Sequence, residues 1–266
     1  MGNPELDVAF NVTVDMPESG SYLPRWTTDA AAFRAELGPR AETGIAYGDH
    51  KREAFDLFHP KSAAQGLVVF VHGGYWLRND RSLWSHFAAG PLAQGWAVAM
   101  PSYILAPEAR VSAITRQIAA AIEAAAARIA GPIRLVGHSA GGHLVTRMAC
   151  ADIATGRAFD GRIAHILSIS GLHDLRLLPQ TTMNEGLRLD AAEAAAESVV
   201  LLEKGRDIPV TAWVGGAERP VFLDLANALA AAWPDVTVHV EPRRHHFDVI
   251  DGLADTHSPL MRRLMA

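Results

Sequence analysis

Cysteine is almost absent from this sequence. Cys150 is the single cysteine among 266 residues, so no disulfide can form within the chain. A disulfide framework of the kind that stabilises small secreted proteins is therefore excluded. Cys150 falls in an apolar stretch that reads as a helix, and we expect it to be a buried, unreactive thiol.

Long apolar runs and blocks of one charge are also lacking. The Ala-rich segment 117–130 contains Gln117, Glu123 and Arg128, so it is too polar to span a membrane. The net charge of −5 is spread along the chain with no basic block, which argues against nucleic-acid and membrane partners. Residues 1–12 lack a basic start followed by an apolar run, so we expect no signal peptide and a cytoplasmic protein.

What the sequence does contain is an alternation of strand and helix patterns. Short β-branched runs without polar residues predict strands covered on both faces. Longer apolar patterns of helical period separate these runs, which predicts an α/β fold with a mostly parallel central sheet and helices on both faces. The expected strands are 54–58, 67–71, 96–100, 133–136, 163–169, 210–214 and 236–240, and the expected helices are 114–129, 141–155, 220–233 and 252–265.

Two regions fall outside this alternation. Residues 1–40 are polar and irregular with a short helical pattern over 29–37, and they are interpreted as an N-terminal arm. Residues 173–208 are interpreted as a small cap-like insertion over the carboxyl edge of the sheet, where open α/β folds bind ligands. No linker or repeat divides the chain, so we expect one domain over 1–266.

The segment GHSAG at 137–141 fits the pattern Gly-x-Ser-x-Gly. It follows an expected strand and opens an apolar helix, which is the setting of a nucleophile elbow. Small residues at Gly137 and Gly141 let the chain turn tightly, so that Ser139 projects above the sheet near a helix N-terminus. The alternative is a Gly-rich turn that holds a helix-capping serine. The elbow interpretation makes Ser139 a candidate nucleophile.

A second glycine motif follows the strand 67–71, before the elbow. His72-Gly73-Gly74 after a strand is typical of the oxyanion loop of lipases and esterases. An ordinary Gly-Gly turn beside a core histidine would be the alternative for this motif alone. Both motifs occur in the expected order, which favours an oxyanion hole made by the amides of Gly73, Gly74 and Ala140.

A histidine base and an acid should follow the serine in this kind of site, in the order serine, acid, histidine. The base is expected after the last strand, at His245 or His246, and we favour His246 because Phe247 could hold its ring in place. The acid is expected after the strand 210–214, at Glu218. Asp224 and Asp174 are the reserve acids.

Together these motifs resemble the kynurenine formamidase (arylformamidase) branch of the α/β-hydrolase superfamily, which is related to the hormone-sensitive-lipase and feruloyl-esterase-like esterases. The similarity extends over about residues 65–250. In that branch the base is the histidine before a phenylalanine, which supports His246, and an acidic residue occupies the position of Glu218. The motifs that carry the resemblance are HGGYW at 72–76, YILAPE at 103–108, GHSAGGHL at 137–144, SGLHDL at 170–175, NEGL at 184–187 and GGAERPVF at 215–222.

The resemblance implies an α/β-hydrolase fold and a serine hydrolase that cleaves a small aryl formamide such as N-formylkynurenine through a formyl-enzyme at Ser139. Tyr75, Trp76 and Tyr103 could line an aromatic substrate pocket, although core packing explains such residues equally well. The alternative function is a small-molecule carboxylesterase that acts on short-chain acyl esters.

No cofactor or metal is expected for this chemistry. The sequence has 12 histidines but no HExxH motif and no other spacing typical of metal ligands. The expected partner is therefore a small-molecule substrate, with a homodimer left open.

Overall fold

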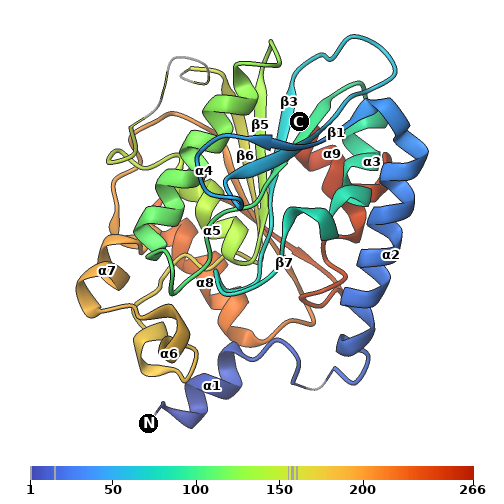
Figure 1. Cartoon of the computed structure of the whole chain (residues 1–266). Helices are drawn as coiled ribbons and strands as arrows, with labels where there is room; N and C mark the ends of the chain where they lie inside the picture. Colours follow the sequence, from blue (N-terminus) through green and yellow to red (C-terminus); the bar gives the residue numbers. More distant parts are fainter. Residues whose placement is uncertain (1, 15, 155, 157–158, 160) are drawn as a thin grey trace.

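A single sheet forms the centre of the computed structural model, which describes residues 2–14, 16–154, 156, 159 and 161–266 (Figure 1). Within these residues eight strands lie in the order β1-β2-β4-β3-β5-β6-β7-β8. The β1–β2 and β2–β4 pairs are antiparallel, and the remaining neighbours are parallel. The expected mostly parallel α/β sheet is confirmed.

The strands and helices follow one another as the sequence pattern predicts over most of the chain. The strands are β1 (Ala41–Ala46), β2 (Ala54–Phe58), β3 (Leu67–Val71), β4 (Ala97–Pro101), β5 (Ile133–His138), β6 (Ile163–Ile169), β7 (Val210–Gly215) and β8 (Thr237–Glu241). The α-helices are α1 (Pro4–Phe10), α2 (Ser19–Leu37), α3 (Ala89–Ala93), α4 (Val111–Ala126), α5 (Ala140–Arg147), α6 (Asn184–Leu187), α7 (Ala191–Ala196), α8 (Pro220–Ala232) and α9 (Pro259–Met265).

Apolar side chains on both faces of the central strands explain why these strands lack polar residues. In β3, Leu67 and Val69 belong to a core cluster with side chains of α4, α5 and α8. Val68 and Phe70 point to the opposite face and join side chains of α2, α3 and α9. A buried strand of this kind alternates between two apolar layers. Figure 1 shows these two groups of helices on either side of the sheet.

The segment 1–40, expected to be irregular apart from a short helical pattern over 29–37, is more helical than predicted. The segment forms α1 and the long helix α2, whose buried side chains are Tyr22, Trp26, Ala30 and Leu37. Gly20 and Pro24 both lie within α2, and these residue types are unfavourable inside helices. They weaken the helical signal that the sequence offers for this stretch.

Two predicted helices end or break earlier than expected. Helix α5 stops at Arg147 and not at 155, because the next residues pair with a distant loop through Gly205 N to Ala149 O (2.9 Å) and Ala151 N to Glu203 O (3.0 Å). The predicted helix 252–265 is a short 3₁₀ turn followed by α9. Ser258 caps α9 by accepting from Met261 N at 2.9 Å, and a proline follows it at the first helical position, which favours a new helix start there.

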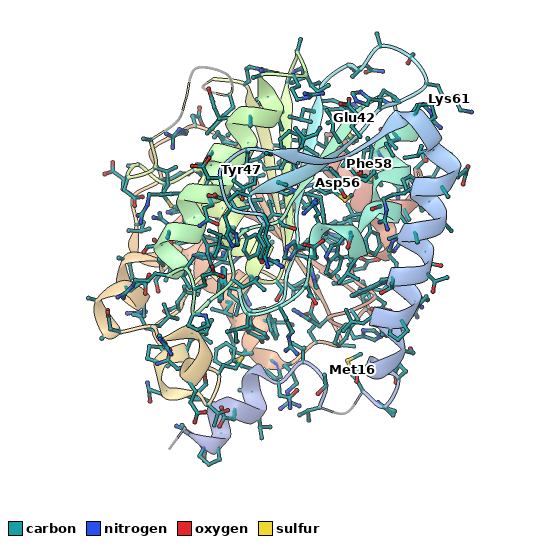
Figure 2. All side chains as sticks on the ribbon, viewed as in Figure 1. Met16, Glu42, Tyr47, Asp56, Phe58 and Lys61 are labelled. Carbon is teal, nitrogen blue, oxygen red and sulfur yellow. The ribbon has the colours of Figure 1, made fainter. Side chains whose placement is uncertain are left out.

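The antiparallel strand β1 was not expected. It lies at the edge of the sheet beside β2 and is partly exposed, so it lacks the apolar run that marks the central strands. In Figure 2 Glu42 and Phe58 mark this hairpin at the upper end of the molecule, far from Met16 at the lower end. The hairpin is therefore remote from the end of the sheet where the N-terminal segment crosses.

The N-terminal segment crosses the lower end of the molecule in Figure 1, next to α6 and α8. Its attachment to that end includes Asn3 N donating to Gln180 O at 2.6 Å and Tyr75 Oη donating to Phe10 O at 2.6 Å. The segment 173–208 between β6 and β7 contains α6 and α7 at the same end.

In the part of the chain that the structure describes, no helix is long and apolar enough to cross a membrane.

A buried ion-pair group at the end of α5 gives a testable statement about stability. Arg147 is 2% exposed; it donates to Asp152 Oδ1 at 2.8 Å and Oδ2 at 2.7 Å, and to Glu197 Oε2 at 3.1 Å. Arg147→Met would leave the buried Glu197 carboxylate without its cation. We expect the free energy of unfolding, measured by urea denaturation, to fall by about 3 kcal/mol or more.

The matched control for this variant is Arg176→Met. Arg176 pairs with Asp174 at 2.7 Å, but its side chain is half exposed, and exposed pairs contribute about 0–1 kcal/mol. Equal losses of stability in the two variants would contradict the assignment of Arg147 as a structural anchor.

Candidate active site

Ser139 lies on the tight turn that joins β5 to α5. Its backbone has φ 57° and ψ −119°, a conformation in which a residue with a Cβ is strained. The turn needs glycine on both sides: a Cβ on Gly137 would lie 2.1 Å from Gly141 O, and one on Gly141 would lie 1.9 Å from Val71 O. The strand, turn and helix expected for the Gly-x-Ser-x-Gly motif are therefore present.

The loop after β3 lies against this turn. A Cβ on Gly73 would come within 2.9 Å of Ser139 Cβ and 2.8 Å of His138 O, so only glycine allows such a close approach. Tyr75 and Trp76 follow with φ values of 52° and 57°. Two consecutive side-chain-bearing residues in the left-handed region show that the surrounding contacts determine the shape of this loop.

The carbonyl of Gly73 is held by two donors. His72 Nδ1 donates to it at 2.8 Å and Asn79 Nδ2 donates to it at 3.1 Å. In a trans peptide the carbonyl and the following N–H point in opposite directions. Fixing the Gly73 oxygen therefore also fixes the direction of the Gly74 N–H.

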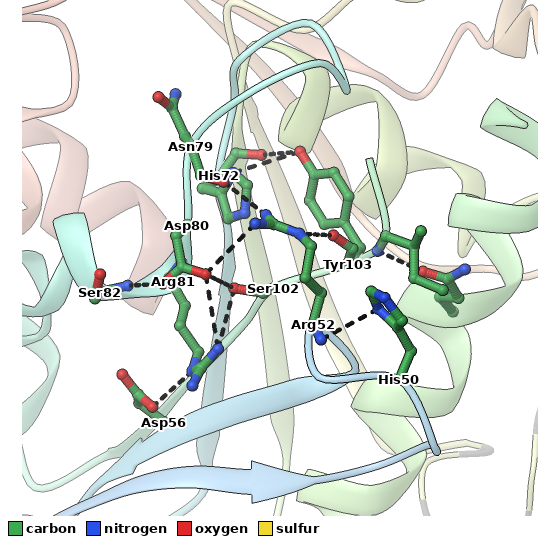
Figure 3. A network of polar contacts seen from close by, with 12 residues as sticks. His50, Arg52, Asp56, His72, Asn79, Asp80, Arg81, Ser82, Ser102 and Tyr103 are labelled. Carbon is green, nitrogen blue, oxygen red and sulfur yellow. Dashed lines mark hydrogen bonds and ion pairs between the residues drawn. The ribbon is translucent and has the colours of Figure 1, made fainter. Parts of the chain in front are cut away.

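A polar network holds Asn79 in turn (Figure 3). Arg52 donates from Nη2 to Asn79 O at 2.6 Å and from Nε to Tyr103 O at 2.7 Å. Next to it, Ser102 Oγ donates to Asp80 Oδ2 at 2.9 Å. This network could not be predicted from sequence, because its members come from three separate segments and no local pattern links them.

The two histidines beside the loop and the turn are buried and neutral. Burial lowers the pKa of His72 to about 4, and its ring stacks on Tyr103 with 4.5 Å between ring centroids. Burial, together with the neighbouring His246, lowers the pKa of His138 well below its usual range. His138 Nε2 donates to His246 O at 2.8 Å. Both rings act as neutral supports in the packing around Ser139.

His246 lies in the loop after β8 and contacts Glu218. Its Nδ1 lies 2.6 Å from Glu218 Oε2, and because a carboxylate only accepts, Nδ1 carries the hydrogen. The other oxygen, Glu218 Oε1, accepts from Ser170 Oγ at 2.5 Å and from Gly215 N at 2.8 Å. The Glu218 side chain is fully buried. Because Nδ1 donates to Glu218, Nε2 is the ring nitrogen of His246 that remains to act as a base.

The alternatives for the base and the acid lie elsewhere. His245 Nε2 contacts Tyr22 Oη of α2 at 3.1 Å. Asp174 forms an ion pair with Arg176 at 2.7 Å, and Asp224 is exposed on α8. The sequence left open which acid contacts which histidine. In the structure this contact is made by Glu218 and His246.

Ser139 and His246 line a common cavity of about 230 Å³. Gly73, Gly74 and Tyr75 lie on the same cavity, and Ala140 is the first residue of α5 beside it. None of the residues 173–208 lines it, so the cap-like insertion supplies no wall. The full lining is Val12, Thr13, Ser19, Gly20, Leu23, Trp26, Gly73, Gly74, Tyr75, Arg78, Asn79, Trp84, His138, Ser139, His246 and Phe247.

Trp76 and Tyr103 do not line this cavity, which corrects the expectation of a pocket made by these two residues and Tyr75. Trp76 is fully buried and meets the ring of His143 edge to face, with 5.2 Å between ring centroids. Tyr103 is fully buried and donates from Oη to His72 O at 3.0 Å. Core packing, the alternative that the sequence allowed, accounts for both.

The N-terminal segment supplies the wall that the sequence did not reveal. Val12, Thr13 and the first turns of α2 line the cavity, and Tyr22 of α2 stacks on Phe247 with 5.2 Å between ring centroids. A usable signal is the pair Tyr22 and Trp26, two aromatic residues four apart in the sequence. In the described residues, no group of three or more His, Cys, Asp or Glu side chains is arranged to hold a metal ion.

Comparisons with known proteins show the family to which this chain is related. A protein-family model described as BD-FAE matches residues 55–216. Kynurenine formamidase from Danio rerio is 29% identical over 239 residues, which covers 83% of this chain and 80% of that protein.

Solved structures are similar over almost the whole chain. The crystal structure of a candidate thioesterase from Silicibacter sp. TM1040 is 49% identical, covers 98% of this chain and 99% of its own, and has a TM-score of 0.96. Esterase B from Lactobacillus rhamnosis is 20% identical, with 92% and 90% of the two chains covered and a TM-score of 0.67, a likeness that concerns the fold alone.

Proposed function

The chain belongs to the BD-FAE family and is a hydrolase of the α/β-hydrolase type, and from this premise we propose that it cleaves a small aryl formamide, such as N-formylkynurenine, through a formyl-enzyme at Ser139. The single observation that carries the mechanism is the buried His246–Glu218 contact on the cavity that Ser139 also lines. The substrate class is supported by the similarity to kynurenine formamidase from Danio rerio.

In the proposed first half-reaction, Ser139 Oγ attacks the formyl carbon while His246 Nε2 takes the hydroxyl proton. The C–N bond then breaks, and His246 returns that proton to the departing arylamine nitrogen. Glu218 keeps the ring in the required tautomer and stabilises its cation, because Nδ1 donates to the carboxylate throughout.

The second half-reaction uses the same groups. Water attacks the formyl ester as His246 takes its proton, formate departs, and the proton returns to the Ser139 oxygen. In each half-reaction the oxyanion is held by the amides of Gly73 or Gly74 and of Ala140, the last of which lies at the N-terminus of α5. The anchored Gly73 carbonyl supports this role, since it keeps the loop amide preoriented.

The size and lining of the cavity suit a small aromatic substrate. Trp26, Trp84 and Phe247 form apolar walls beside Ser139. The cavity volume of about 230 Å³ suits a small-molecule substrate. Because the formyl group is very small, selectivity would depend on the aryl side, where these rings can stack.

The test measures formate release from N-formylkynurenine and formanilide next to hydrolysis of p-nitrophenyl acetate and a short acyl thioester. Ser139→Ala and His246→Ala serve as inactive controls. We expect the highest kcat/KM for the formamides. Rapid turnover of the acetate ester with no formate from N-formylkynurenine would instead support the carboxylesterase alternative, and preference for the thioester would align the chain with its relative from Silicibacter.

Asn79→Gly should lower kcat about tenfold and leave KM within about twofold, since it removes one of the two donors that orient the Gly73 carbonyl. Glycine is chosen because Asn79 has a φ of 78°, which alanine would adopt only with strain. The control is Asn227→Ala, an exposed position on α8. Steady-state kinetics with formanilide check the prediction, and a rise in KM at unchanged kcat would contradict it.

A further inference from the structure

One described residue with a permanent charge, Arg78, lines the cavity beside Ser139. Apart from histidines, the described residues that line it include a single ionisable cation, Arg78, and no carboxylate. Glu218, the nearest acid that the mechanism uses, is fully buried behind His246. Among the described residues of the walls, an anion that enters the cavity would therefore meet a cation and no carboxylate that repels it.

Arg78 is unpaired, in contrast to its neighbours. Its side chain is exposed and has no hydrogen bond or ion pair with any residue that the structure describes. Arg52 and Arg81, on the same side of the loop, are instead held by carbonyl groups, by Asp80 and by Asp56. Arg52 and Arg81 thus stabilise the loop after β3, and the side chain of Arg78 is available to bind a ligand.

The backbone of Arg78 is nevertheless fixed relative to the site. Arg78 N donates to Gly74 O at 3.2 Å, which closes a tight turn onto the oxyanion loop. A Cβ on Gly74 would lie only 2.5 Å from Arg78 O, so the two residues stay in contact. The backbone from which the Arg78 side chain extends is therefore held next to the oxyanion loop.

A second cavity, of about 270 Å³, also has Arg78 in its lining. It shares Val12, Thr13, Tyr75 and Arg78 with the cavity beside Ser139. Its own carboxylate, Asp7, is held through Oδ1 by Thr182 N at 2.7 Å and Thr182 Oγ1 at 2.9 Å. A ligand longer than a formanilide would pass Arg78 on its way from Ser139 to this second cavity.

We propose that Arg78 binds a carboxylate on the leaving-group side of the substrate, so that the enzyme selects aryl formamides that carry an anionic side chain. The inference rests on the proposed function, of which it defines the substrate class. A guanidinium group pairs with a carboxylate through two parallel hydrogen bonds. N-formylkynurenine has a carboxylate remote from its formamide and thus fits the requirement.

The test compares N-formylkynurenine with its carboxamide, which differs only in lacking the negative charge. Arg78→Ala should raise KM for the carboxylate substrate about tenfold, as expected for a solvent-accessible charge-assisted pair. The carboxamide should show the same KM in both enzymes, and kcat should be unchanged for both substrates. Arg78→Lys should recover part of the loss, and higher salt should shrink the difference. The control is Arg116→Ala, an exposed arginine of α4 outside both cavities.

Equal changes of KM for the two substrates, or no change for either, would overturn the inference and leave the formamidase function intact. If the wild-type enzyme releases no formate, the proposed function fails instead. The inference is then judged by calorimetric binding of kynurenine to Ser139→Ala and to Ser139→Ala with Arg78→Ala. Weaker binding to the double variant supports it, and equal binding, or none to either protein at millimolar kynurenine, overturns it.

Discussion

Ser139→Ala is expected to reduce hydrolysis of every substrate by about a million-fold, to a level set by the oxyanion amides and binding alone. The reason is that the proposed mechanism uses Ser139 as its nucleophile: Thr13 and Ser19 also line the cavity, but neither lies on a strained strand–turn–helix elbow like that of Ser139. Formate release and ester hydrolysis, measured with the same stock of protein, check the prediction.

Loss of activity in this variant should not reflect loss of the fold. Ser139 has a φ of 57°, and alanine at this position carries the same strain as serine. We expect the urea midpoint of Ser139→Ala to match that of the wild type. Intact-mass measurement after treatment with a fluorophosphonate should show one adduct on the wild type and none on the variant.

A double variant makes the prediction more demanding. Residues that act as one unit are strongly non-additive, so Ser139→Ala combined with His246→Ala should be no less active than Ser139→Ala alone. Multiplied losses would mean that His246 acts on a reaction in which Ser139 has no part. Fluorophosphonate labelling of Ser139→Ala would likewise contradict the assignment of the nucleophile.

The parts of this molecule that could be predicted from sequence are those whose cause is local. The strand Leu67–Val71 is apolar because both of its faces are buried, and a continuous apolar run reports that directly. The turn at Ser139 needs glycine at 137 and 141 because backbone atoms approach within the radius of a Cβ. Short motifs of this type retain their meaning without knowledge of the rest of the fold.

Features that depend on contacts between distant segments could not be predicted in this way. Part of the wall of the cavity comes from the first turns of α2, where Gly20 and Pro24 weaken the helical pattern that the sequence offers. The end of α5 at Arg147 is determined by pairing of residues 149–151 with a loop more than fifty residues away. The position of Trp76 in the core, away from the cavity, follows from the left-handed turn at that residue.

The sequence left Glu218, Asp224 and Asp174 as candidates for the acid that orients His246. The variant Glu218→Gln distinguishes between these candidates. We expect it to lower kcat by about a thousand-fold to ten-thousand-fold, by analogy with removal of the charge from the acid of a serine triad. The amide oxygen can keep the contacts with Ser170 Oγ and Gly215 N. The amide NH₂ then faces His246 Nδ1, which must become an acceptor.

The consequence is the wrong tautomer of His246. With Nδ1 as acceptor, the ring hydrogen moves to Nε2, and a protonated Nε2 cannot take the proton of Ser139. Volume and burial are nearly unchanged by the substitution, so the effect should appear in kcat rather than in the urea midpoint. Asp224→Asn, on the exposed face of α8, is the matched control and should keep kcat within about twofold of the wild type. If Asp224→Asn or Asp174→Asn lost as much activity as Glu218→Gln, the buried Glu218–His246 contact would be a structural feature and the orienting acid would have to be sought among those residues.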